Sequence, residues 1–215
     1  PHRETEENGF LAEVSGKRQT STDTTTFTNP EADQVEKEIC GYLKREHLTI
    51  VKFICESTTC FVYKVKKSGC DGHPEQTLAA KVIDHRKLPE LLRTDHLPKE
   101  LAIVRSVRHP NIIRTDTVLT ELPNFSIIVS EFAVEGDMVS FLERSPAVEH
   151  HPPLPYLKKW FVETTRALAY LHQHEIAHRD VKLDNILLCR RAIARIPVCN
   201  HCSAYGTLIA KLCKC

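Results

Sequence analysis

Five short stretches rich in β-branched and aromatic residues limit the fold of this chain more than any other feature of its sequence. They lie at residues 48–53, 61–66, 77–83, 118–122 and 125–132. Five strands at such close spacing predict an antiparallel sheet. One helix is predicted between the third and fourth strands, because apolar residues recur there at the spacing that places them on a single helical face. These residues are Leu97, Leu101, Val104 and Val107.

The chain beyond residue 134 has a helical pattern. Asp137 can cap the start of a short helix, and a proline-rich break follows at residues 152–155. A longer helix then carries an apolar stripe that we expect to be buried: Trp160, Phe161, Thr164, Leu168 and Leu171. The expected fold class is therefore α+β, a small β-rich lobe followed by a helical lobe, with the joint near residues 131–136.

The composition is that of an ordinary globular protein. The 215 residues carry a formal net charge of +1, which gives no electrostatic reason to expect nucleic acid or an anionic membrane as a partner. No apolar run approaches the roughly 18 to 20 residues of a membrane span, so we expect a cytoplasmic protein. The chain begins at Pro1 rather than at methionine, and we therefore expect a fragment of a longer protein.

Both ends of the chain differ from the rest in composition. Residues 1–38 are rich in Thr, Ser and Glu with almost no apolar periodicity, which predicts a disordered leader, or alternatively a docking or phosphorylated arm. Residues 199–215 form an atypical cysteine-rich tail, whereas the other cysteines are scattered singly and are expected to be reduced. The tail is either unstructured with reduced thiols or a small zinc site. The zinc ligands would be Cys199, Cys202, Cys213 and Cys215, with His201 in reserve.

The clearest chemistry lies at residues 178–185, which read His-Arg-Asp-Val-Lys-Leu-Asp-Asn. Phosphoryl transfer requires a cation at the phosphates, oxygen ligands for a metal and a carboxylate that orients the attacking hydroxyl. Asp180 is placed to accept the hydroxyl proton, and Lys182 can steady the transferred group. Asn185 offers an oxygen to Mg²⁺.

Two further charged residues fit the same chemistry. Lys81 ends an apolar strand, where its ammonium can reach the α- and β-phosphates of a nucleotide. Glu100 lies in the predicted helix and can pair with Lys81 to hold it extended.

Together these residues resemble the protein kinase family over roughly residues 48–188. Lys182 resembles the serine/threonine branch, and residues 97–101 and 134–138 resemble the testis-specific serine kinases, near the calmodulin-dependent group. The resemblance implies a bilobal kinase domain at 47–198, with the N-lobe at about 47–133 and part of the C-lobe at about 134–198. It also implies ATP and Mg²⁺ as cofactors and a protein as substrate.

The resemblance implies the remaining site residues as well. The adenine would lie between three apolar side chains: Val62, Ala79 and Leu187. The adenine-binding hinge would include Glu131 and Ala133, and Asp137 would approach the ribose. The phosphate loop, rich in glycine in the family, would have these residues at its three glycine positions: Cys55, Ser57 and Cys60.

Two departures from the family pattern predict weak ATP and Mg²⁺ binding and an inactive chain. All three loop glycines are replaced, although close approach of backbone amides to phosphate favours glycine. The aspartate of the family's D-F-G motif, a metal ligand, is expected thirteen residues after Asn185, where the chain has Val198, and no Asp or Glu occurs from 186 to 215. The alternative is a pseudokinase-like interaction module that binds a regulatory protein, or a chaperone, without phosphotransfer.

Overall fold

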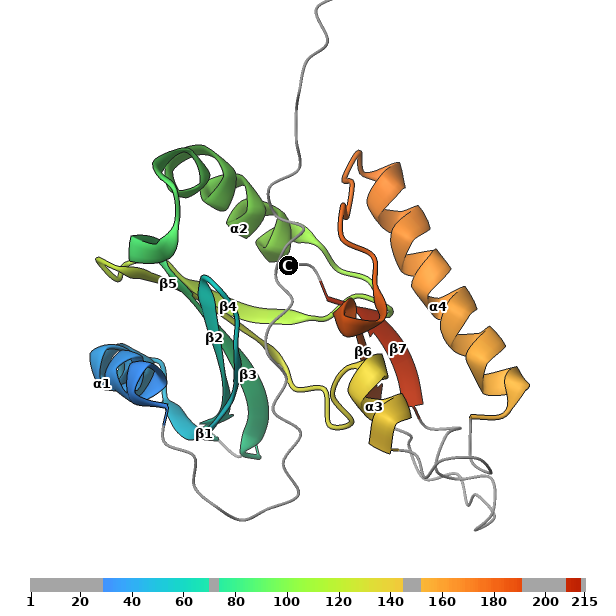
Figure 1. Cartoon of the computed structure of the whole chain (residues 1–215), viewed down its shortest axis with the longest axis horizontal. Coiled ribbons are helices and arrows are strands. Elements are labelled where there is room, and N and C mark those ends of the chain that lie inside the picture. Colours follow the sequence, from blue (N-terminus) through green and yellow to red (C-terminus); the bar gives the residue numbers. More distant parts are fainter. Residues whose placement is uncertain (1–28, 70–73, 145–151, 191–207, 214–215) are drawn as a thin grey trace, which may run out of the picture.

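A computed structural model describes residues 29–69, 74–144, 152–190 and 208–213 (Figure 1). No helix among these residues is long and apolar enough to cross a membrane. The helices are α1 (Pro30–Arg45), α2 (Leu97–Ser106), α3 (Met138–Arg144) and α4 (Leu154–Gln173), with short turns of helix η1 (His85–Lys87), η2 (Leu92–His96) and η3 (Leu183–Asn185). The strands are β1 (Leu48–Glu56), β2 (Cys60–Lys67), β3 (Gln76–Asp84), β4 (Thr115–Leu119), β5 (Phe125–Glu131), β6 (Ile186–Arg190) and β7 (Leu208–Leu212).

The predicted antiparallel sheet is confirmed. Its five strands have the order β1-β2-β3-β5-β4, and every neighbouring pair is antiparallel. The fourth strand lies three residues earlier than predicted. Leu122 is buried, as a strand residue would be, but it lies in the turn after β4. The helix predicted at the centre of this unit is confirmed as α2, and the α+β class holds.

The sheet has two differently covered faces, as expected from the alternation of side chains along a strand. One set of side chains in β2 and β3 is buried in a cluster with α1: Phe61, Tyr63, Val65, Leu78, Ala80 and Val82. The intervening set includes Cys60 and Ile83, which pack with Leu97 and Leu101 of α2. The two helices therefore contact opposite faces of one sheet (Figure 1).

Helix α1 corrects the predicted leader. Residues 30–38 are helical, so the prediction of disorder across 1–38 is wrong for them, whereas residues 1–28 lie outside the described part. The Asn29 side chain caps the helix by accepting from the amides of Glu31 and Ala32, and Pro30 fits its first turn. Four apolar residues separated by charged ones form its buried stripe: Ala32, Val35, Ile39 and Leu43. Burial of this stripe against the sheet stabilises a helix that the polar composition of the segment did not predict.

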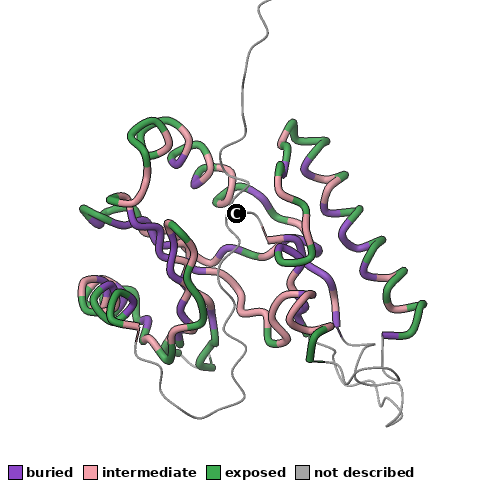
Figure 2. The backbone as a smooth tube through the Cα atoms, in the orientation of Figure 1, coloured by how far each residue is buried: buried purple, intermediate pink, exposed green. Residues whose placement is uncertain are grey.

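Strand β7 corrects the predicted tail. It pairs antiparallel with β6 and is buried in the core of the second unit (Figure 2). The Ala210 amide donates to Glu163 Oε2 at 2.8 Å, and Lys159 Nζ donates to the Leu208 carbonyl at 2.6 Å, so α4 holds this strand directly. Residues 208–213 thus pack with the C-lobe and are not an unstructured tail. Four of the residues considered for zinc lie outside the described part: Cys199, His201, Cys202 and Cys215.

The buried stripe of α4 differs from the prediction at one residue. Trp160, Thr164 and Leu171 are buried and Leu168 is half-buried, but Phe161 is 73% exposed. Adjacent residues are separated by about 100° around a helix, so burial of Trp160 beneath β7 turns Phe161 outward. Phe161 instead lies in an exposed apolar strip at helical spacing with Leu154 and Leu157.

These opposite environments predict opposite effects of truncating two neighbouring aromatic residues. Trp160→Ala should lower the free energy of unfolding by roughly 3 to 5 kcal/mol, because it empties a buried site. Phe161→Ala should change it by less than about 0.5 kcal/mol, since an exposed side chain loses little burial. Urea unfolding followed by circular dichroism measures both, and an equal loss in the two variants would contradict the described orientation of α4.

Candidate functional site

Three residues predicted to contact the nucleotide lie on the face of the sheet that also meets α2. Lys81 of β3 pairs with Val62 of β2 and Ile128 of β5, and directly paired residues in an antiparallel ladder point to the same side. Ala79 precedes Lys81 by two residues and shares that side. All three predicted residues are half-buried, whereas their neighbours on the α1 face are fully buried. The register therefore gathers an ammonium and two small apolar side chains on one surface.

Glu100 lies in the first turn of α2, on the helix that covers the same face. Its side chain and that of Lys81 are both half-buried. Leu97 and Leu101, on either side of Glu100 in the sequence, pack against the sheet. The placement brings Glu100 and Lys81 onto facing elements, and a direct ion pair between them stays a prediction.

The β1–β2 hairpin forms without glycine. Its turn is closed by the Ser57 amide, which donates to the Cys60 carbonyl at 2.8 Å, and by the Asp84 amide, which donates to the Thr59 carbonyl at 2.9 Å. Positive φ angles at non-glycine residues of the described chain occur at His47, Glu175 and Arg179, and none lies in this hairpin. Cys55, Ser57 and Cys60 therefore adopt the hairpin without the left-handed backbone that favours glycine. Their β-carbons still limit how closely a phosphate approaches.

Residues 178–185 form a compact polar loop around Asp180. The Asn185 amide nitrogen donates to Asp180 Oδ2 at 2.8 Å and to the Asp180 carbonyl at 2.9 Å, and Lys182 Nζ lies 3.0 Å from Asp180 Oδ2. Asn185 is buried, whereas Asp180 and Lys182 are half-buried. Arg179 holds a left-handed φ of 68°, a conformation that surrounding contacts must enforce. The three predicted catalytic residues are thus brought together, with the Asp180 carboxylate oriented by two neighbours.

Strand β7 leads the chain back to this loop. The Cys213 amide donates to the Asn185 carbonyl at 2.8 Å, and its carbonyl lies 2.8 Å from His178 Nε2. The Asp180 amide donates to His178 Nδ1 at 3.3 Å, so the proton of a neutral His178 is on Nε2, where it donates to Cys213.

Val198, predicted to stand at the position of the D-F-G aspartate, lies outside the described residues and stays a prediction. Seventeen residues, 191–207, separate β6 from β7, and Val198 is among them. The residue adjoining the catalytic loop at the end of β7 is Cys213, followed in the sequence by Lys214. A carboxylate is absent at either position, because residues 186–215 contain no Asp or Glu.

The hinge residues lie between the two units. Glu131 accepts from the Arg114 amide at 2.7 Å and pairs with Lys211 of β7 at 2.6 Å. Ala133 accepts through its carbonyl from the Gly136 amide at 3.1 Å, in a turn where Gly136 has a φ of 73°. These contacts fix the strand exit that the resemblance assigns to adenine recognition.

Asp137 and Leu187 face each other across an isolated antiparallel bridge. The Asp137 carboxylate accepts from the Ser140 amide at 2.9 Å and from its hydroxyl at 2.7 Å, which confirms the predicted cap at the start of α3. Leu187 is half-buried between two buried neighbours, Ile186 and Leu188. Alternation therefore turns Leu187 away from the core beneath α4.

The residues present fit a conventional Mg²⁺ site only in part, because Asn185 can offer an amide oxygen but residues 186–215 supply no carboxylate. Mg²⁺ in phosphoryl-transfer sites is held by carboxylates together with the nucleotide phosphates. Asn185 directs its amide nitrogen to Asp180, and Asp180 Oδ2 is shared with Lys182. No group of three potential metal ligands from His, Cys, Asp and Glu occurs within the described ranges.

Several residues that organise the site were not predicted. Lys211 pairs with the hinge, and Asn111 Nδ2 donates to the Ala210 carbonyl at 3.1 Å while the Asn111 carbonyl accepts from Leu212. Cys189 lies near the same hinge pair, and burial raises the pKa of its thiol to about 12, so it stays protonated. A sequence signal did exist for β7, since apolar residues surround Lys211 at 208–212.

Comparison with known proteins agrees with this geometry. Residues 48–197 match the protein kinase domain family. Mouse testis-specific serine/threonine-protein kinase 2 is 30% identical over 126 residues, covering 59% of this chain and 34% of that protein. Rice CBL-interacting protein kinase 16 is 31% identical over 159 residues, covering 74% of this chain and 32% of that protein. The matches thus span about a third of the length of these relatives. This chain belongs to the protein kinase family, and its relatives are serine/threonine kinases.

Proposed function

We propose that this chain carries the nucleotide-binding and catalytic-loop part of a serine/threonine protein kinase. The reaction is transfer of the γ-phosphoryl group of ATP to a hydroxyl of a protein substrate. Asp180 accepts the hydroxyl proton, Lys182 steadies the transferred group and Lys81 contacts the α- and β-phosphates. The observation that carries this proposal is the oriented Asp180 carboxylate, which Asn185 and Lys182 hold at 2.8 and 3.0 Å.

We further propose that the 215-residue sequence binds ATP weakly and transfers no measurable phosphate. The developing charge at the γ-phosphate needs a cation held by the protein, and no carboxylate follows Asn185 to hold one. The β-carbons in the hairpin also keep backbone amides farther from the phosphates than glycine would. An oriented base gains little when the phosphate is neither clamped nor neutralised.

The second candidate is an interaction module that binds protein partners without phosphotransfer. It is favoured by the exposed apolar strip of α4, formed by Leu154, Leu157 and Phe161. Exposed strips of this kind favour association with other proteins, including chaperones.

The proposed location is the cytoplasm, which agrees with the balanced charge of the chain.

The first prediction from this proposal concerns the missing carboxylate. Chimeras that replace the end of the chain with Asp-Phe-Gly and the complete C-lobe of a close relative should regain transfer of radiolabelled phosphate when Asp-Phe-Gly begins at position 214. A second chimera places the motif at 198 and should be less active, because Cys213, directly before position 214, donates from its amide to the Asn185 carbonyl at 2.8 Å. The unmodified chain should show no transfer.

The matched control is Asp180→Asn in the active chimera, which removes the base while keeping the size of the side chain. It should abolish transfer. Activity of the unmodified chain that depends on Asp180 would contradict the proposed defect, and activity only in the chimera joined at 198 would contradict the assigned register.

A second prediction concerns Lys81. Glu100→Ala should weaken binding of a fluorescent ATP analogue by about tenfold, or ~1.4 kcal/mol, because Lys81 loses the partner that extends it toward the phosphates. The exposed Glu90, near the start of the same helical segment, is the control, and Glu90→Ala should leave affinity unchanged. Equal affinities in the two variants would show that Glu100 does not position Lys81.

A further inference from the structure

The last residue pair of the β1–β2 hairpin turns its side chains toward α1. Glu56 pairs with Phe61, and Phe61 is fully buried in the cluster that contains the stripe of α1. The adjacent pair, Cys55 and Val62, points to the opposite face by alternation. The hairpin is therefore contacted by α1 from the side opposite to the predicted nucleotide surface.

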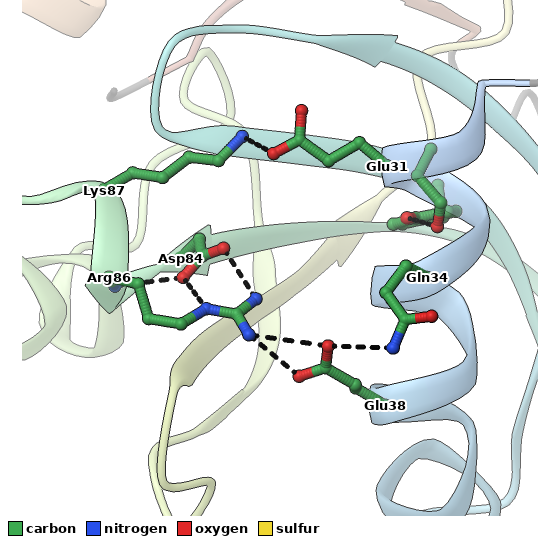
Figure 3. A network of polar contacts seen from close by, with 8 residues as sticks. Glu31, Gln34, Glu38, Asp84, Arg86 and Lys87 are labelled. Atoms are coloured by element: carbon green, nitrogen blue, oxygen red, sulfur yellow. Dashed lines mark hydrogen bonds and ion pairs between the residues drawn. The ribbon is translucent and has the colours of Figure 1, made fainter.

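Asn29, at the start of α1, contacts Glu56 directly, and Lys87 of η1 connects Glu31 of α1 with Phe61. Asn29 Nδ2 donates to Glu56 Oε2 at 2.9 Å while its side-chain oxygen caps the helix. Lys87 forms an ion pair with Glu31 (Figure 3). Its ammonium lies 4.5 Å from the centroid of the Phe61 ring. One polar contact and one cation–π contact thus connect the start of α1 with the hairpin tip.

A second connection joins α1 to the end of β3. Arg86 donates to Asp84 from Nε at 2.9 Å and from Nη2 at 2.8 Å, and it reaches Glu38 of α1 at 3.2 Å (Figure 3). Burial would raise the pKa of Asp84, but hydrogen bonds and the charge of Arg86 outweigh it and hold that pKa below its ordinary value. The Asp84 amide in turn donates to the Thr59 carbonyl in the hairpin turn.

We propose that α1 positions the β1–β2 hairpin for phosphate binding, with Asn29, Glu31 and Lys87 as its positioning residues. The apolar stripe of α1 packs the helix onto the sheet, but apolar packing does not fix the orientation of the hairpin. The polar contacts are directional, and they reach the hairpin tip. Edge hairpins are mobile when few contacts hold them. The effect on phosphate binding rests on the proposed nucleotide function, but the restraint of the hairpin by α1 does not.

Amide hydrogen exchange of the whole chain tests directly whether α1 restrains the β1–β2 hairpin. Asn29→Asp retains an excellent helix cap but replaces the donor to Glu56 with a carboxylate that repels it. Glu31→Gln removes the ion pair with Lys87. Each should speed exchange of the amides at 56–61 and at Asp84 by about two- to fivefold, the range expected for an exposed polar contact. Urea midpoints should fall only slightly, because the same small contact is also lost on global unfolding.

Two further variants make the test specific. Asp33→Asn removes a carboxylate from the same helical turn, where Asp33 is exposed, and should leave hairpin exchange unchanged. Adding Glu56→Gln to Asn29→Asp should restore slow exchange, because the new amide can donate to the carboxylate introduced at position 29. A purely structural role of the helix would not give this rescue. Unchanged exchange in Asn29→Asp and Glu31→Gln, or equal acceleration in Asp33→Asn, would overturn the proposal.

Binding of a fluorescent ATP analogue separates this inference from the proposed function. If the wild type binds, Asn29→Asp and Glu31→Gln should each weaken binding by about two- to fivefold. Faster hairpin exchange with unchanged affinity would overturn the link to phosphate. No binding by the wild type would overturn the proposed nucleotide function, while the exchange data would still decide whether α1 holds the hairpin.

Discussion

The alternation of side chains along β2 and β3 is the constraint on which the rest of the structure depends. Strands covered on both faces must present an apolar set to each side, and here one set is buried beneath α1 while the other meets α2. Lys81 belongs to the second set, so its charge lies on the half-buried face that points toward α2. A shift of one residue in the pairing would bury that ammonium beneath α1. The register of the sheet therefore fixes both the packing of α1 and the position of the candidate site.

The catalytic loop depends in a similar way on β7. The backbone groups of β7 and of Cys213 after it form hydrogen bonds with the Glu163 side chain of α4, with Asn111 and with the Asn185 carbonyl, so three segments distant in sequence share one support. Lys211 adds a contact to the hinge at Glu131. Asp180 is oriented because the loop around it is held from both ends. The end of the same strand brings Cys213, and no carboxylate, beside Asn185, which supports the proposed lack of phosphotransfer.

Local patterns predicted the features that are encoded locally. The five strands, α2 and the polar loop at 178–185 each follow from spacing or from residue types within a few positions, although β1 extends three residues beyond its predicted end and β4 begins three residues before its predicted start. Helix α1 was missed because its few apolar residues are separated by polar and charged ones. The helix is stabilised when the sheet covers this apolar stripe. The orientation of Phe161 depends on β7, which lies on a distant segment. The count to Val198 ends among residues 191–207, outside the described part of the chain, so it stays a prediction.

We propose that the face of the sheet carrying Lys81 binds the nucleotide phosphates. An acyl phosphate of ATP, which acylates lysines close to its phosphates, tests this most directly when the labelled peptides are identified by mass spectrometry. Lys81 should be labelled ahead of the exposed Lys52, and excess ATP should suppress its labelling without affecting Lys52. Labelling of Lys81 that is no faster than that of Lys52, or that ATP does not suppress, would contradict the account.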